Sequence, residues 1–439
     1  MSLQTKNKRY LNLYFQVHQP RRLGQFSFFD IGTGRDYFDD GLNQLIMQRV
    51  TKDCYLPTNL LLLKLVKKHP NIRITFSVSG SALKQMEVYA PAALESFQML
   101  AATGAVELLS ETYHHSLSFL NSKEEFYTQI KMHDDKIHKL FGVRPTVFRN
   151  TELIYNDEIG RVIDSLGYKA IFADGIERIL QGRSPNHLYQ HPDKEIKILL
   201  RNYRLSDDIA FRFMQKDWSA WPLTPAKYVG WLAAIPPKEN LVTLGLDYET
   251  FGEHHKANIG IFQFLEDLLT KLANHKQIEM VTPSEAVALV QPKDIVKVPE
   301  SISWADEDRD LSAWLGNDMQ RDAFETLTEM EAKIKEIGEP RLLNTWHYLQ
   351  SSDHFYYMSM KKGNDGGVHE YFSPYPSPYE AFMNYMNVVS DLALQIEKKQ
   401  KDQIELENKI NTEFLQPDEL KMLCIERSDR TWKPEALTF

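Results

Sequence analysis

Short apolar runs alternate with longer, helix-like segments through the first two-thirds of the chain, and this alternation limits the folds that it can adopt. Most of the runs are apolar throughout, as expected for strands that are covered on both faces. Strand–helix–strand order of this kind is typical of a parallel sheet, either open or closed into a barrel. The predicted strands span 10–17, 72–78, 106–109, 146–148, 170–172, 198–201 and 241–246.

Seven strands within residues 1–292 favour an α/β fold in which an incomplete parallel (β/α)7 barrel forms the first domain, although an open doubly wound sheet fits the same order. The pattern changes near residue 292, where segment 291–308 reads as a linker. Apolar residues then recur at helical spacing, which predicts a C-terminal α-helical domain over 300–410. These residues are Phe324, Leu327, Met330, Ile334 and Ile337, which Gly338 follows, and later Phe382, Met386, Val389, Ala393 and Ile396. A Gly- and Pro-rich loop is predicted at 361–380, and the structure of the tail, 411–439, is left open.

Composition excludes several classes of protein. With 43% hydrophobic and 25% charged residues, the 439-residue chain is neither disordered nor collagen-like. Its net charge of −9 does not favour binding to nucleic acid or to an anionic membrane. Cys54 and Cys424 lie far apart, so neither a zinc ribbon nor a disulfide framework is expected. Because no apolar run approaches ~20 residues and the N-terminus reads as a strand, we expect a cytoplasmic protein.

Polar clusters recur where the predicted strands end. His18 follows the first strand, segment 110–115 the third, segment 149–152 the fourth, and segment 247–255 the seventh. In a parallel barrel the carboxyl ends of the strands meet at one face, where active sites are built. The recurrence therefore predicts one polar site assembled from several strand ends.

Glu152 and Asp247 are the carboxylates that we single out in these clusters. Arg149 and Asn150 precede Glu152 and can stabilise its charge, whereas an apolar run precedes Asp247 and would raise its pKa. Two such carboxyl groups can act as an attacking carboxylate and a proton donor. A helix cap at Glu152 and a loop salt bridge at Asp247 fit the spacing equally well.

Two nearby glutamates and several histidines leave alternatives open. Glu249 and Glu253 lie in the same short segment as Asp247 and are rivals for its role. Three imidazoles and a water can hold a catalytic zinc ion, but no HExxH or HxxxH pair occurs at these sites. Adjacent histidines on a strand also point to opposite faces. We therefore predict no metal, and expect the histidines to hydrogen-bond to a substrate or to hold a carboxylate. They are His18, His114, His115, His254 and His255.

Aromatic residues make up 11% of the chain, and several lie beside the charged clusters. Flat apolar faces with polar edges suit sugar rings, although most individual aromatic residues are expected in the core. Trp218 and Trp221 flank a proline-containing loop. In segment 344–358, a helix would place Trp346, Gln350, Asp353 and Tyr357 on one face, which could close over the barrel or simply pack against it.

Five segments, in order along the chain, carry a family resemblance. They are FQVHQP at 15–20, GAVELLSETYHHSL at 104–117, FRNTELIY at 148–155, LDYETFGEHH at 246–255 and TWHYLQSSDHFYYM at 345–358. With these motifs the chain resembles glycoside hydrolase family 57, in its α-amylase branch. The first motif departs from the His-x-His of many members, because Gln16 stands at the earlier position.

The resemblance implies an incomplete seven-stranded barrel, a helical domain that contributes to the active-site cleft, and retaining hydrolysis of α-1,4-glucans without metal or cofactor. It assigns Glu152 as the nucleophile and Asp247 as the general acid/base. A retaining pair predicts carboxyl groups about 5–5.5 Å apart instead of roughly 6.5–9.5 Å. The residues expected to contact substrate or tune the two acids are His18, Glu107, Glu111, His114, Arg149, Trp221, His254, Trp346, Asp353 and His354.

Three alternatives remain at this level. A 4-α-glucanotransferase would use the same two carboxylates with a sugar hydroxyl as acceptor. A metal-dependent deacetylase or mannosidase-like enzyme could use a similar barrel. A non-catalytic glucan-binding protein would keep the fold without turnover. The oligomeric state is left open by the sequence.

Overall fold

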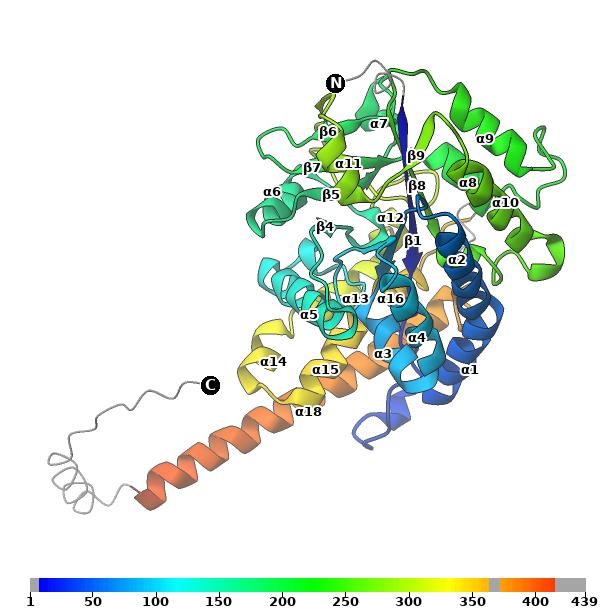
Figure 1. The fold of residues 1–439 in the computed structure, drawn as a ribbon. Coiled ribbons are helices and arrows are strands. Elements are labelled where there is room, and N and C mark those ends of the chain that lie inside the picture. The colour runs from blue at the N-terminus through cyan, green and yellow to red at the C-terminus, as the bar shows by residue number, and fades with distance from the viewer. Residues whose placement is uncertain (1–7, 363–371, 415–439) are drawn as a thin grey trace, which may run out of the picture.

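Seven parallel strands form the centre of the molecule in the computed structural model, which describes residues 8–362 and 372–414 (Figure 1). Every predicted strand is confirmed, with ends that differ by no more than two residues. The strands are β1 (Arg9–Val17), β2 (Ile74–Val78), β3 (Val106–Leu108), β4 (Val147–Phe148), β5 (Ala170–Asp174), β7 (Lys197–Arg201) and β8 (Leu241–Asp247).

The order of these strands is that of an incomplete parallel barrel. β1 lies between β2 and β8, and its register places Gln16 opposite Asp247. Two joins are narrow: a single bridge between Ser110 and Phe148 connects β3 to β4, and one pair, Arg201 with Thr243, connects β7 to β8. The carboxyl ends of the seven strands therefore meet at one face, as the sequence predicts.

Three short strands were not predicted: β6 (Leu188–Gln190), β9 (Ile278–Met280) and β10 (Asp294–Ile295). With two or three residues each, they are too short to show a periodic pattern. β6 runs antiparallel to β7, and β10 pairs with β6. Because β10 lies in the segment predicted as a linker, that segment packs on the barrel. Ile302, also from this segment, exchanges backbone hydrogen bonds with Tyr155.

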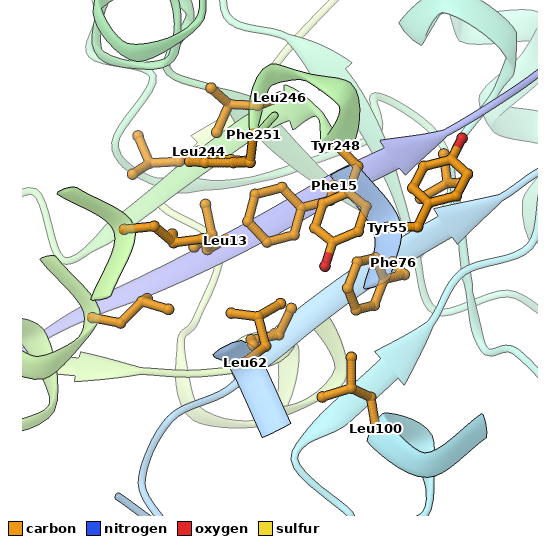
Figure 2. Packing of buried hydrophobic residues seen from close by; sticks show 14 of the residues in the cluster. Leu13, Phe15, Tyr55, Leu62, Phe76, Leu100, Leu244, Leu246, Tyr248 and Phe251 are labelled. Carbon is orange, nitrogen blue, oxygen red and sulfur yellow. The ribbon is translucent and has the colours of Figure 1, made fainter. Parts of the chain in front are cut away.

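Side chains on β1 alternate between two cores. Leu13 and Phe15 point outward beneath the helices, where Figure 2 shows Phe15 packed with Phe76 of β2. Tyr14 points inward and packs against Phe172 with ring centroids 4.7 Å apart. Gly245 of β8 leaves room for this ring, since a Cβ there would lie 2.1 Å from Tyr14 Cζ.

The barrel strands are separated by helices that cover the outer core (Figure 1). Ser122 begins one of them, α5, by accepting a hydrogen bond from the Glu125 backbone N–H. They are α1 (Asp40–Val50), α2 (Leu56–Lys68), α3 (Gly80–Tyr89), α4 (Pro91–Ala101), α5 (Lys123–Phe141), α6 (Asp157–Ser165), α7 (Glu177–Leu180), α8 (Tyr203–Ala210), α9 (Pro225–Ala234), α10 (Ile261–Ala273) and α11 (Pro283–Leu289).

The described part of the chain after Leu311 is helical. The predicted run over 324–337 is divided into two helices, the second of which ends at the left-handed Gly338. The long later helix is present as α18, which extends away from the rest of the molecule in Figure 1. These helices are α12 (Ser312–Leu315), α13 (Asp318–Thr328), α14 (Glu331–Ile337), α15 (Pro340–Leu349), α16 (Ser352–Tyr356) and α18 (Pro378–Phe414).

Segment 344–358 differs from the single helix that we considered. It divides into α15 and α16 at Gln350 and Ser351, so Trp346 and Asp353 do not share a continuous helical face. Part of the predicted loop, 363–371, and most of the tail, 415–439, lie outside the described residues. Among the helices of residues 8–362 and 372–414, none has the length and apolar character needed to cross a membrane.

Candidate active site

Glu152 and Asp247 both lie at the carboxyl face of the barrel. Glu152 follows β4 in a short helical turn, Thr151–Leu153, and Asp247 is the last residue of β8. Both Glu152 and Leu153 have positive φ values, 56° and 52°. Left-handed backbone is costly for such residues, about 1 kcal/mol each, and is commonly found at functional sites where surrounding contacts hold it.

The Glu152 carboxylate receives two hydrogen bonds. The imidazole of His115 lies with Nε2 3.0 Å from Oε1, and the indole N–H of Trp304 donates to Oε2 at 2.6 Å. Burial raises the pKa of Glu152, but the hydrogen bond and charge of His115, with smaller contributions from Arg149 and Trp304, outweigh it and lower the pKa. Glu152 is therefore ionised at neutral pH.

Asp247 has the opposite electrostatic environment. Burial raises its pKa, the negative charge of Glu152 raises it further, and Arg149 and Arg201 only partly oppose them, so the pKa reaches about 6. The next residue, Tyr248, is buried in the outer core against Phe15, with ring centroids 5.1 Å apart (Figure 2). This alternation along the chain directs Asp247 toward the barrel interior.

His115 connects Glu152, whose side chain is 22% exposed, to the fully buried carboxylate of Glu111. Its Nδ1 lies 3.0 Å from Glu111 Oε2, and Ser77 also donates to Glu111 at 2.9 Å. Burial lowers the pKa of His115, but the hydrogen bonds to Glu111 and Glu152 and their charges raise it to about 9. His115 is therefore an imidazolium at neutral pH, and it supplies the positive charge that keeps Glu152 ionised.

The His115→Gln variant is expected to lose stability in a pH-dependent manner. Because the pKa of His115 is about 9 when folded and about 6.5 in an unfolded chain, its charge stabilises the protein fully below pH 6.5, and this contribution is lost as pH rises through 9. The variant should lose about 3 kcal/mol of unfolding free energy at pH 6 and less at pH 9.5. Denaturant unfolding at both pH values measures this. A loss of unfolding free energy that is the same at both pH values would contradict the assignment.

His18 joins this arrangement from the end of β1. Its ring stacks on His115 with centroids 4.0 Å apart, and its Nε2 lies 2.8 Å from Asp353 Oδ2 on α16. Burial and the positive charge of His115 lower the pKa of His18 despite Asp353, so the ring is neutral. The pair formed by His18 and Asp353 connects the barrel to the helical region beside the two carboxylates.

The rivals of Asp247 have other partners. Glu249 is buried, receives hydrogen bonds from Tyr55 and Gln19, and has a pKa raised to about 8 by burial and by the charge of Asp247. Glu253 pairs with Arg49 at 2.9 Å. Asp247 is therefore the carboxyl group of this segment that lies within the electrostatic influence of Glu152, His115 and Arg149.

The remaining predicted site residues have different surroundings. Arg149 is fully buried and its guanidinium lies 4.6 Å from the Trp304 ring centroid, beside the two carboxylates. His114 turns away from Glu152 and packs against Tyr348, with centroids 4.7 Å apart. Trp221 is 43% exposed in the loop between α8 and α9. The ring of His254 lies near that of Phe372, with centroids 5.7 Å apart.

Three predicted residues are engaged elsewhere. Glu107 lies inside β3 and accepts hydrogen bonds from the backbone and the hydroxyl of Ser284 on α11, at 2.9 and 2.6 Å. Trp346 is 1% exposed and donates to the Leu327 carbonyl in the helical core. His354 is buried against Tyr385. The structure does not bring these three side chains to Glu152 and Asp247, because each is used in packing or in a structural hydrogen bond.

Trp304 was missed by sequence reasoning. It lies in the segment predicted as a linker, where no periodicity marks a buried residue. The only signal in the sequence is a tryptophan in an otherwise polar and acidic stretch.

A cluster of three or more His, Cys, Asp or Glu side chains able to hold a metal ion is absent from the described ranges.

Comparison with known proteins identifies the family. Residues 12–299 match glycosyl hydrolase family 57. A Methanocaldococcus jannaschii protein with the provisional name alpha-amylase is 43% identical over 396 residues, which cover 88% of this chain and 84% of that protein.

Solved structures share the fold at low sequence identity. A branching enzyme from Thermococcus kodakaraensis has a TM-score of 0.68 at 12% identity and covers 92% of this chain and 94% of its own. An α-amylase from Thermotoga maritima scores 0.60 at 13% identity, covering 90% and 96%. A 4-α-glucanotransferase from Thermococcus litoralis scores 0.62 at 16% identity; the match covers 88% of this chain and 60% of that longer one. From the family match and the 43% identical relative, the chain belongs to glycosyl hydrolase family 57.

Proposed function

We propose that this protein is a retaining glycoside hydrolase that cleaves α-1,4-glucosidic bonds of starch- or glycogen-type glucans or maltooligosaccharides. The observation that carries the proposal is the unequal pair of carboxyl groups at the barrel face. Glu152 has a lowered pKa and two hydrogen bonds to its carboxylate, whereas the pKa of its neighbour Asp247 is about 6. Such a pair provides a nucleophile and an acid at the same pH.

In the first step, the Glu152 carboxylate attacks the anomeric carbon and forms a glycosyl ester as the glycosidic bond breaks. Asp247 gives its proton to the departing oxygen. In the second step, the Asp247 carboxylate accepts a proton from water, and that water displaces Glu152 from the sugar. The proton on Asp247 is thereby restored, and the two displacements retain the anomeric configuration. The charged His115 stabilises the Glu152 carboxylate that is released.

The substrate class is supported by the family and by the names of its members. The relatives and structures that share the fold include alpha-amylases, a branching enzyme and a 4-alpha-glucanotransferase. We propose that His18, Asp353, Glu111 and Arg149 orient the sugar or tune the two acids. The first three are connected to Glu152 through His115, and the charge of Arg149 acts on both carboxyl groups. Trp221 and His254 remain candidates for outer sugar contacts. The proposed reaction needs no metal or cofactor. We also propose that the enzyme is cytoplasmic.

The pH dependence of kcat/KM follows from the two carboxyl groups. Glu152 must be ionised and Asp247 protonated in the free enzyme. As pH rises, kcat/KM should therefore first increase while Glu152 ionises, at a pH below the usual pKa of a glutamate. It should then decrease above pH 6, where Asp247 loses its proton. Above the pKa of Asp247 we expect about a tenfold fall per pH unit. Rates on maltoheptaose between pH 3.5 and 8.5 measure it. A plateau that extends unchanged to pH 8.5 would contradict Asp247 as the acid.

Product analysis tests the function. Chelator-treated protein is incubated with maltoheptaose and with glycogen, and product lengths and new reducing ends are followed. Shorter products with rising reducing ends support hydrolysis. Products both longer and shorter than the donor, without a net rise, would instead assign a glucanotransferase. Activity that disappears with the chelator would assign a metal enzyme, and binding without turnover would overturn the catalytic proposal.

A further inference from the structure

Arg309 lies outside the catalytic pair, in the segment that follows the barrel, and its side chain reaches one buried carboxylate, Asp174, and one partly buried carboxylate, Asp207. It donates to Asp174 at the end of β5 and to Asp207 on α8, the latter at 3.3 Å. Arg201 donates to the same two carboxylates, at 3.2 and 2.5 Å. These four side chains, each at most 16% exposed, form a closed and charge-balanced group that we name the Arg309 cluster.

A short closed loop of backbone connects the cluster to Trp304. The Ser303 N–H donates to the Arg309 carbonyl at 3.1 Å, and the Ser303 hydroxyl donates to the Asp310 carbonyl at 2.7 Å. The next residue, Trp304, contacts Glu152 twice: through its indole N–H at 2.6 Å and through its backbone N–H, which donates to the Glu152 carbonyl at 3.2 Å. A displacement of Arg309 would therefore move the group that donates to the Glu152 carboxylate.

The cluster also reaches the strand that carries Asp247. The Nε of Arg201 donates to the Gly245 carbonyl of β8 at 2.9 Å, two residues before Asp247. The Arg201 guanidinium lies 5.4 Å from the ring centroid of Trp304. The same arginine thus contacts the strand of the acid and the ring that donates to the nucleophile.

The loop from Ser303 to Asp310 needs such anchors, because its backbone is strained. Asp306 and Arg309 have φ values of 45° and 49°, in the left-handed region that non-glycine residues rarely adopt. Lys361 holds the other side of the loop through Asp306 at 2.8 Å and Asp308 at 2.7 Å. Strained conformations of this kind persist only where surrounding contacts impose them.

We propose that Arg309 is a positioning residue for the reaction. By bonding to Asp174 and Asp207 it holds the loop in the conformation that places the Trp304 indole N–H on Glu152, and so keeps the nucleophile oriented and ionised. The inference rests on the proposed function, because it assumes that Glu152 is the nucleophile. Arg309 itself touches no reacting atom; it acts through Trp304.

The test compares Arg309→Gln, Trp304→Phe and the double variant by kcat, KM and the pH profile of kcat/KM. Loss of a hydrogen bond to a charged group changes its pKa by about one unit or more. Each single variant should therefore lower kcat about tenfold, with little change in KM. The midpoint of the acidic limb of the pH profile should move up by about one pH unit. The basic limb should stay near pH 6. The kcat of the double variant should be no lower than that of the less active single variant, because both changes remove the same contact.

Two further variants keep the test decisive. Arg309→Lys keeps the positive charge but cannot donate to both carboxylates in the same geometry, so it should give an intermediate shift of the acidic limb. It replaces Arg309→Gln in the test if that variant does not fold. Arg73→Gln is the matched control, since Arg73 precedes β2 at the opposite end of the barrel, where it pairs with Glu285 at 3.0 Å; it should shift neither limb.

An Arg309 variant that melts at a lower temperature but keeps the acidic limb would overturn the proposal, and so would losses that add to those of Trp304→Phe. An active Glu152→Gln enzyme would instead overturn the proposed function.

Discussion

Glu152→Gln is expected to lose at least about 10⁴-fold in kcat while keeping its fold, because an amide cannot form the glycosyl ester. The two side chains are nearly isosteric, and the amide can still accept a hydrogen bond from the Trp304 N–H. The amide also removes the charge that raises the pKa of Asp247, second in size after burial, so the pKa of Asp247 should fall below about 6. Turnover on maltoheptaose, melting temperature and titration of Asp247 measure the three effects.

The matched control is Glu279→Gln, which changes a glutamate of β9 that pairs with Lys8 at 2.6 Å, away from the carboxyl face. It should keep wild-type turnover. If Glu152→Gln were to retain more than about a hundredth of the wild-type kcat while folded, Glu152 could not be the nucleophile, and its contacts with His115 and Trp304 would have a structural purpose only.

Asp247→Asn is expected to lower kcat on maltoheptaose by about 10²–10⁴-fold, the usual contribution of a general acid. The loss should depend on the leaving group. A sugar hydroxyl needs protonation as it departs, whereas a nitrophenolate does not, so formation of the glycosyl-enzyme from an activated aryl glycoside should be almost unaffected. The second step still lacks its base, so the intermediate should accumulate. Burst kinetics and the mass of the intact protein detect it.

The pH profile provides the second readout of this variant. The basic limb near pH 6 should disappear in Asp247→Asn, because the group that titrates there is gone. Glu253→Gln is an informative comparison, since Glu253 lies in the same segment but pairs with Arg49 and Lys256. Equal losses on natural and activated substrates, with an unchanged basic limb, would show that Asp247 is not the acid.

The barrel could be predicted from the sequence because its strands are buried on both faces. Continuous apolar runs such as 10–17 and 241–246, placed between helical segments, are typical of parallel strands that helices cover. Three strands, β6, β9 and β10, were not predicted, because a segment of two or three residues is too short to show a periodic pattern. The break between α15 and α16 was also not predicted, because neither a glycine nor a proline marks Gln350 or Ser351 in the sequence.

The site was only partly predictable, for reasons that differ between residues. The strand ends predicted that Glu152 and Asp247 lie at one face, because the carboxyl ends of parallel strands meet there. His115, and not His114, contacts Glu152, and its backbone has a φ of 53° that the sequence does not reveal. Glu107 lies in a family motif, yet its position inside β3 sends it to Ser284. Trp304 and Arg309 reach the site from a segment without periodicity, through contacts that only tertiary structure defines.

Retaining hydrolysis by Glu152 and Asp247 can be observed by following the anomeric protons of newly formed reducing ends by NMR while the wild-type protein acts on maltoheptaose. With two displacements at the anomeric carbon, new reducing ends should appear first as the α-anomer and reach the equilibrium mixture only later by mutarotation. New ends that appear first as the β-anomer would show a single displacement and contradict the assignment of Glu152 as a covalent nucleophile.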